Sequence, residues 1–226
     1  MTLESQIVKL LLDGGACDVG MSSPEDGPAN LKYAISFVVP LSEAIVDQIE
    51  HSPTYSYFHH YRTVNALIDM LSLKTGLLLQ KNGYLYMPIG ASQSQPKAGQ
   101  RTHEGLYSHK KAAVLGGLGT IGKSALFLHR KYGPRVRLGT IFTDYEFSEV
   151  KHDLSSESVC GSCDLCRASC PAAAIKGNEW FPGCEREFIV DAWSCNDYMR
   201  EHFMKIGRGS VCGICMSVCP YDQKQH

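Results

Sequence analysis

The sequence predicts a mixed α/β fold of the α+β kind, with a larger domain over residues 1–150 and a small domain over residues 151–226. The first part alternates between segments with helical apolar spacing and short runs of β-branched and aromatic residues. Nine of the ten cysteines follow between positions 160 and 219. A chain of 226 residues is long enough to bury an apolar core ahead of a small cysteine-rich domain.

The first elements are predicted from apolar periodicity and from capping residues. Leucine and isoleucine at helical spacing predict a helix over residues 3–12, with Thr2 as its cap and Gly14 as its stop. Residues 31–39 are rich in β-branched and aromatic side chains and precede Pro40. This composition predicts a buried strand.

The remaining elements of the larger domain are predicted in the same way. Residues 41–51 have a helical pattern, and a long helix is expected over residues 54–81 behind the Ser52-Pro53 pair. Residues 90–107 lack apolar periodicity and predict a long loop, which is often a functional feature. The other predicted elements are a strand over 83–89, a short helix over 108–115, and strands over 125–129 and 136–142.

A glycine-rich segment, residues 117–124, satisfies both the phosphate-loop pattern G-x-x-x-x-G-K-S and the dinucleotide pattern G-x-G-x-x-G. A phosphate loop follows a strand and opens a helix, whereas here a helix is expected before the segment and a strand after it. The sequence therefore favours another role, in which glycines let the backbone approach a cofactor or substrate closely and Lys123 supplies a nearby cation. A nucleotide-binding reductase is kept as an alternative.

Charge is distributed unevenly along a chain whose net charge is only -1. Residues 97–137 contain nine Lys or Arg and a single acid, Glu104. This segment is either a solvated basic surface or a site for an anionic substrate, phosphate or nucleic acid.

The cysteine spacing predicts two [4Fe-4S] clusters. A C-x2-C-x2-C-x3-C run followed by proline is the ferredoxin pattern, in which three thiolates hold one cluster and the fourth reaches the second. A C-x2-C-x3-C-P run further on is one cysteine short, so Cys195 or Cys184 must supply the missing ligand. Crossed ligation assigns one cluster to Cys160, Cys163, Cys166 and Cys219, and the other to Cys170, Cys212, Cys215 and Cys195.

The alternatives to clusters are structural zinc and disulfides. Zinc also uses C-x2-C pairs, but it does not require the repeated C-x3-C-P ending. Disulfides suit secreted domains, and residues 1–15 lack the apolar run of a secretory signal. Unpaired thiolate ligands indicate a reducing, cytoplasmic setting, and no stretch approaches the ~20 apolar residues of a membrane span.

Four stretches together resemble epoxyqueuosine reductases, which are similar in turn to the corrinoid-binding core of reductive dehalogenases. These stretches are residues 55–62 (Y-x-x-F-H-H-Y-R), 112–124, 132–139 and the S-C-N-D-Y around Cys195. The resemblance implies a nitroreductase-like domain that holds cobalamin and a ferredoxin-like domain that delivers single electrons to it. It favours Cys195 over Cys184 as the eighth ligand. The expected cofactor-binding residues are Gly117, Gly119, Gly122, Lys123, Tyr55 and His59, although the aromatic cluster around the last two also fits ordinary packing.

The resemblance also has two departures that affect the expected substrate. The family uses an acidic proton donor ahead of the glycine-rich segment, and by an ungapped count His103 takes that place, with Glu104 beside it. Either side chain can donate a proton. The chain stops seven residues after Cys219, short of the helical repeats that help the family hold tRNA, so a tRNA substrate is not expected.

The sequence therefore predicts an iron-sulfur reductase that is supplied by an external low-potential electron donor and acts on a small molecule. The alternative is an electron-transfer protein that reduces a partner, for example a corrinoid protein, without substrate chemistry of its own.

Overall fold

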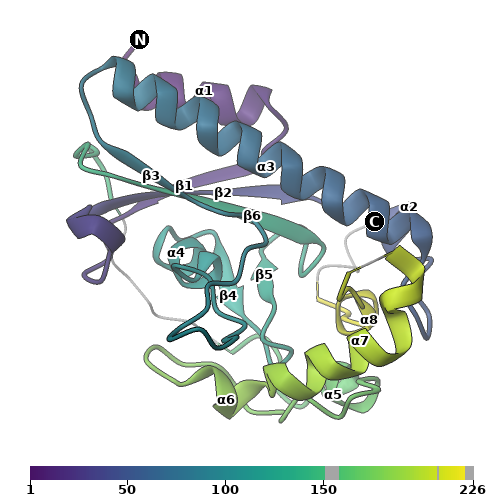
Figure 1. Ribbon diagram of the computed structural model, residues 1–226. Helices are drawn as coiled ribbons and strands as arrows, with labels where there is room; N and C mark the ends of the chain where they lie inside the picture. The colour runs from purple at the N-terminus through teal and green to yellow at the C-terminus, as the bar shows by residue number, and fades with distance from the viewer. Residues whose placement is uncertain (151–157, 208, 222–226) are drawn as a thin grey trace. The chain divides into compact units, whose positions relative to one another are not determined.

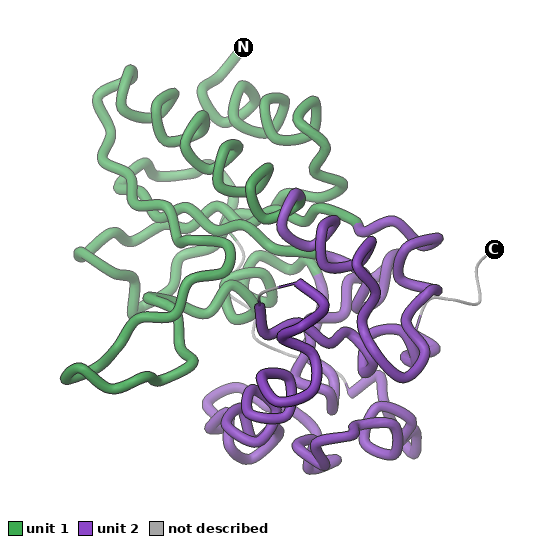
Figure 2. The backbone as a smooth tube through the Cα atoms, turned by 45° about the vertical axis from the view of Figure 1, so that its right-hand side comes forward, with its two compact units in different colours: residues 1–40, 64–118, 137–154 green, residues 41–63, 119–136, 155–226 purple. Residues whose placement is uncertain are grey.

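The computed structural model describes residues 1–150, 158–207 and 209–221. The chain forms two compact units, shown in green and purple in Figure 2. Unit 1 contains residues 1–40, 64–118 and 137–154, and unit 2 contains residues 41–63, 119–136 and 155–226. The two units are thus interleaved in sequence, while the single boundary after residue 150 stays a prediction.

Unit 1 is built on a four-stranded sheet with strand order β1-β2-β6-β3. The strands are β1 (Asp18–Ser22), β2 (Tyr33–Pro40), β3 (Tyr86–Ile89) and β6 (Val136–Thr143). β1 runs antiparallel to β2, with Asp18 opposite Val38, and β3 runs antiparallel to β6, with Tyr86 opposite Thr143. The two inner strands are almost entirely buried, as their apolar runs predict.

Helices cover both faces of this sheet (Figure 1). α1 (Leu3–Asp13) and the unit 1 part of α3 (Tyr55–Lys81) lie on one face, and α4 (His109–Leu115) packs on β1 and β2 from the other. Thr2 caps α1 by accepting a hydrogen bond from the Ser5 amide at 3.2 Å, and Ser108 caps α4 by accepting one from the Lys111 amide at 3.3 Å. These three helices, and with them the mixed α/β fold, are confirmed.

β1 was not predicted from the sequence. Its residues DVGMS show no clear alternation, and Gly20 at their centre disfavours a strand. The glycine is required by packing, because a Cβ at this position would lie 2.4 Å from the carbonyl oxygen of Gly116 behind α4. β1 is therefore stabilised by a close approach of two backbones.

Unit 2 contains a β-hairpin, several short helices and one helix of 16 residues. The hairpin strands are β4 (Gly119–Ile121) and β5 (Phe127–His129), which run antiparallel. The helix predicted over residues 41–51 shortens to α2 (Glu43–Val46), because the chain turns after it and buries Ile49 beside Val46. The other helices are α5 (Leu165–Ala168), α6 (Arg186–Ile189), α7 (Ala192–Gly207) and α8 (Ile214–Ser217), and a 3-10 turn, η1 (Pro28–Asn30), lies in unit 1.

Within the three described ranges, no helix has both the length and the apolar character needed to cross a membrane.

A partly buried histidine in unit 1 makes stability depend on pH. The Nε2–H of His109 donates to the Gly90 carbonyl at 3.1 Å, and its Nδ1 accepts from the buried Thr140 hydroxyl at 2.9 Å. Burial lowers the pKa of His109, and the charge of Arg137 lowers it further, against the opposing effects of the Gly90 carbonyl and of Asp69.

The unfolded chain therefore binds a proton at this site more readily than the folded chain. We expect unfolding stability to be highest above the ordinary histidine pKa of about 6.5 and to fall as the pH drops below it. Denaturant unfolding under anaerobic conditions at pH 7.5 and 5.5 should show a smaller loss for His109→Gln than for the wild type. The exposed His51 gives a control, since His51→Gln should lose as much free energy of unfolding between pH 7.5 and 5.5 as the wild type. An equal loss in all three proteins would exclude a role of His109.

Candidate iron-sulfur site

The first predicted set of cysteines lines one cavity in unit 2. The cavity has a volume of about 300 Å³, and its lining includes Cys160, Cys163, Cys166 and Cys219. Burial first, and then the charges of nearby thiols, raise the pKa of Cys166 to about 11; those thiols belong to Cys160, Cys219 and Cys163. A cavity walled by four thiols fits an iron-sulfur cluster, whose irons need four thiolates around them.

The second predicted set is also brought together. Burial raises the pKa of Cys195 to about 11, with added effects from the thiols of Cys212 and Cys170. The pKa of Cys215 is raised by burial and by the thiols of Cys212, Cys195, Cys170 and Cys166. Because Cys166 belongs to the first set, the two sets lie close enough to influence each other electrostatically.

Short helices hold the cysteines in place. α5 contains Cys166 and α8 contains Cys215, and these two helices contact each other. The third cysteine of the first run and the second cysteine of the second run therefore each lie in a single helical turn. Gly213, just before α8, has φ +88, and a Cβ there would lie 2.8 Å from Ile49 and 2.9 Å from Tyr57, so this entry to α8 requires glycine.

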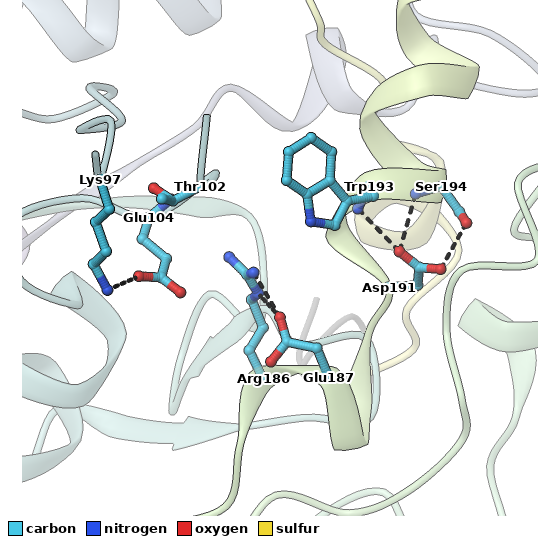
Figure 3. A network of polar contacts seen from close by, with 8 residues as sticks. All are labelled: Lys97, Thr102, Glu104, Arg186, Glu187, Asp191, Trp193 and Ser194. Carbon is cyan, nitrogen blue, oxygen red and sulfur yellow. Dashed lines mark hydrogen bonds and ion pairs between the residues drawn. The ribbon is translucent and has the colours of Figure 1, made fainter. Parts of the chain in front are cut away.

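Asp191 caps the start of α7 (Figure 3), and its carbonyl oxygen accepts a hydrogen bond from the Cys195 amide at 3.1 Å. Asp191 accepts hydrogen bonds from the amides of Trp193 and Ser194, each at 3.0 Å, and from the Ser194 hydroxyl at 2.7 Å. The bonds from Ser194 lower the pKa of Asp191 most. Cys184 instead lies in a turn ahead of α6, where its amide donates to the Phe181 carbonyl at 3.1 Å.

The glycine-rich segment does not form a phosphate loop. α4 precedes it, and β4 lies inside it, so the strand–loop–helix order that a phosphate loop requires is not formed. Gly117 follows α4 with φ +71, and its amide donates to the Val114 carbonyl at 2.8 Å. Gly122 borders the first cavity, where a Cβ would lie 3.3 Å from the sulfur of Cys160.

Gly119 is required by the hairpin itself. A Cβ at this position would lie 2.1 Å from the carbonyl oxygen of Leu128 on β5. We expect Gly119→Ala to destabilise the protein by roughly 1–3 kcal/mol even without any added ligand, because backbone cannot move aside cheaply. Gly105→Ala is the matched control, since a Cβ at Gly105 would lie no closer than 3.4 Å to its neighbours. Equal stabilities of the two variants in denaturant unfolding would contradict this explanation.

Lys123 faces the cysteine-rich region. Its ammonium group donates to the carbonyl oxygens of Gly161 at 2.6 Å and Cys163 at 3.3 Å. The sequence predicts that this lysine lies beside a cofactor or substrate. The G-K-S pattern does not predict its contacts with the first cysteine run.

The predicted proton donors lie in the loop of unit 1. Glu104 is exposed and forms an ion pair with Lys97 at 2.6 Å, and its amide donates to the Thr102 hydroxyl oxygen at 3.2 Å (Figure 3). His103 beside it has a left-handed backbone, with φ +53.

The two predicted cofactor-binding residues of α3 lie at its exposed start. Tyr55 is 72% exposed, and His59 is exposed one helical turn later. The buried aromatic residue of this turn is Tyr57.

Sequence reasoning missed one polar contact of this segment. His60 accepts a hydrogen bond from the Ser42 amide at 3.0 Å, and burial lowers its pKa, with a further contribution from His59.

Comparison with known proteins supports the prediction of two [4Fe-4S] clusters. Residues 159–222 match the family model of the 4Fe-4S double cluster binding domain. The chain is 27% identical over 169 residues to a tetrachloroethene reductive dehalogenase of Desulfitobacterium hafniense, a match that covers 68% of this chain and 27% of the relative. It is also 27% identical over 122 residues to the epoxyqueuosine reductase of Listeria monocytogenes, covering 53% of this chain and 31% of the relative.

The fold is shared with a solved reductive dehalogenase whose structure is described with a mechanism for B12-dependent dehalogenation. The TM-score is 0.74 at 18% identity, and the match covers 97% of this chain and 32% of that one. The matched part of the chain thus spans less than a third of the length of each of these three proteins. Residues 159–222 are therefore similar to a double [4Fe-4S] cluster binding domain, within a chain that resembles both the reductive dehalogenases and the epoxyqueuosine reductases.

Proposed function

We propose that this protein is an iron-sulfur reductase that takes single electrons from a low-potential donor and passes them through two [4Fe-4S] clusters to an acceptor. When bound, such clusters accept and release one electron at a time. The observation that carries the proposal is the closeness of the two sets of four cysteines, because α5, which contains Cys166, contacts α8, which contains Cys215. Ligand sets this close favour transfer from one cluster to the other. A reducing compartment such as the cytoplasm is part of this proposal.

The ligands proposed for the two clusters are those of the crossed pattern. Cys160, Cys163, Cys166 and Cys219 would hold one, and Cys170, Cys195, Cys212 and Cys215 the other. The cavity shared by the first four supports this assignment. The effect of the Cys212 and Cys170 thiols on the pKa of Cys195 supports the second.

A corrinoid bound by this chain is the first proposed acceptor. The likeness to a reductive dehalogenase described as B12-dependent supports it. The residues expected to bind the corrinoid support it only in part. Gly119 and Gly122 already contact Leu128 or Cys160, and Lys123 contacts the first cysteine run, so none of the three needs a corrinoid to explain it. His103 and Glu104 are the proposed proton donors for the substrate.

The second proposed acceptor is a partner protein. The observation that favours it is that three of the six residues expected to bind the corrinoid make other contacts. Gly119 and Gly122 lie against Leu128 or Cys160, and Lys123 contacts the first cysteine run. In this function the chain would transfer electrons without chemistry on a small substrate.

Anaerobic purification with analysis of iron and of extracted pigment tests the proposal. About eight irons per chain together with a corrinoid would support the first acceptor. The same iron content without a corrinoid, before and after incubation with added cobalamin, would exclude a corrinoid held by this chain and favour a partner. A protein that binds no iron would overturn both.

A further inference from the structure

Lys123 is a buried cation held against the first cysteine run. The residue is only 8% exposed, and its ammonium group donates to the Gly161 carbonyl at 2.6 Å and to the Cys163 carbonyl at 3.3 Å. It also lies 3.5 Å from a carboxylate oxygen of Asp164. Lysine is rarely buried unless it is paired. These contacts therefore account for the burial of its charge.

The backbone of Lys123 faces the same turn. Its amide nitrogen lies 3.5 Å from the sulfur of Cys160, within the range of a hydrogen bond to sulfur. The preceding Gly122 allows this approach, because a side chain there would crowd the same sulfur at 3.3 Å. The segment thus presents an N–H donor to Cys160 and a positive charge to the carbonyl groups of Gly161 and Cys163.

Both features stabilise negative charge on a cluster held by these cysteines. Reduction adds one electron, and hydrogen bonds to the sulfurs together with the local charge set how favourable this is. A cation buried away from water is screened less than one at the surface. Asp164 acts in the opposite direction, because its carboxylate disfavours the added electron.

We propose that Lys123 is a positioning residue that raises the reduction potential of the cluster assigned to Cys160, Cys163, Cys166 and Cys219. It does so by fixing the turn of residues 160–163 and by supplying positive charge beside it. This inference rests on the cluster ligands of the proposed function. It gives the G-K-S ending of the glycine-rich segment a role in tuning a cluster, without any bound phosphate.

Lys123→Met tests the contribution of the charge, since it keeps the backbone amide and most of the side-chain volume. Potentiometric titration of the anaerobic protein, followed by electron paramagnetic resonance, should resolve two cluster potentials in the wild type. We expect the variant to keep its iron while one potential falls, with about a tenfold loss in the one-electron reduction equilibrium, or ~59 mV. The other potential should move less. Lys205→Met, which removes an exposed lysine of α7, should leave both potentials unchanged.

Asp164→Asn provides the opposite test. Removing this carboxylate should raise the same potential, and the double variant Lys123→Met/Asp164→Asn should return it toward the wild-type value. If Lys123→Met loses its iron, the test is the direction in which Asp164→Asn changes the potential of the first cluster. Unchanged potentials in fully loaded Lys123→Met, or no rise in Asp164→Asn, would overturn the role of Lys123. A wild-type protein without two reducible clusters would overturn the proposed function instead.

Discussion

Replacing Cys195 with serine should remove about half of the iron, whereas replacing Cys184 with serine should leave the iron content unchanged. Cys195 lies in the first turn of α7, and its thiol is among those that raise the pKa of Cys215. A cluster that loses one of four thiolates is bound weakly, so iron should fall from about eight to about four per chain.

The two serine variants are matched controls for each other, because both remove one partly buried thiol from the same unit. Iron and sulfide analysis of anaerobically prepared protein measures the effect, and electron paramagnetic resonance shows which signal is lost. The reverse outcome, with iron lost in Cys184→Ser and kept in Cys195→Ser, would make Cys184 the eighth ligand.

Removing the iron should unfold the cysteine-rich part of unit 2 while the sheet of unit 1 stays folded. α5, α6 and α8 are each only four residues long, and helices this short are unstable without tertiary contacts. The thiol-lined cavity cannot supply the apolar core that would hold them together. Metal binding therefore has to contribute folding energy, as it does in other small metal-binding domains.

Hydrogen exchange of the anaerobic protein with and without a chelator measures this effect. The amides of Ala168 and Val218, which donate the hydrogen bonds that close α5 and α8, should lose protection by on the order of a hundredfold. Amides in β2 and β6 should keep theirs and serve as the internal control. Equal protection in both states would show that unit 2 folds without iron.

The strongly periodic elements of the fold could be predicted from the sequence. α1 and α4 have clear caps at Thr2 and Ser108, and β2 is rich in β-branched and aromatic residues. β1 could not be predicted, because its formation depends on the close approach of Gly20 to Gly116, a contact between residues far apart in the chain.

Contacts between residues far apart in the chain determine which segments belong to unit 2, and these contacts leave no local pattern in the sequence. Gly207 at the end of α7 lies against Phe58, where a Cβ would be 2.2 Å from the ring, and Gly213 lies against Tyr57. These contacts join the start of α3 to the cysteine-rich region. Aromatic residues that looked suited to a cofactor cavity therefore include two that pack on glycines of the same unit.

The cysteine pattern was the most informative part of the sequence, because cluster ligands follow fixed spacings. The glycine-rich segment was less informative, because G-x-x-x-x-G-K-S describes residue types and leaves the backbone undefined. Here the same letters form a hairpin, with Gly119 against β5 and Lys123 against the turn of residues 160–163. Only the three-dimensional arrangement connects this segment to the cysteines.

Iron and sulfide analysis of the wild-type protein, purified under strict exclusion of air, shows whether its cysteines hold two [4Fe-4S] clusters. We expect about eight irons and about eight sulfides per chain, in two clusters that each accept one electron. A colourless protein that contains zinc and no sulfide would contradict it.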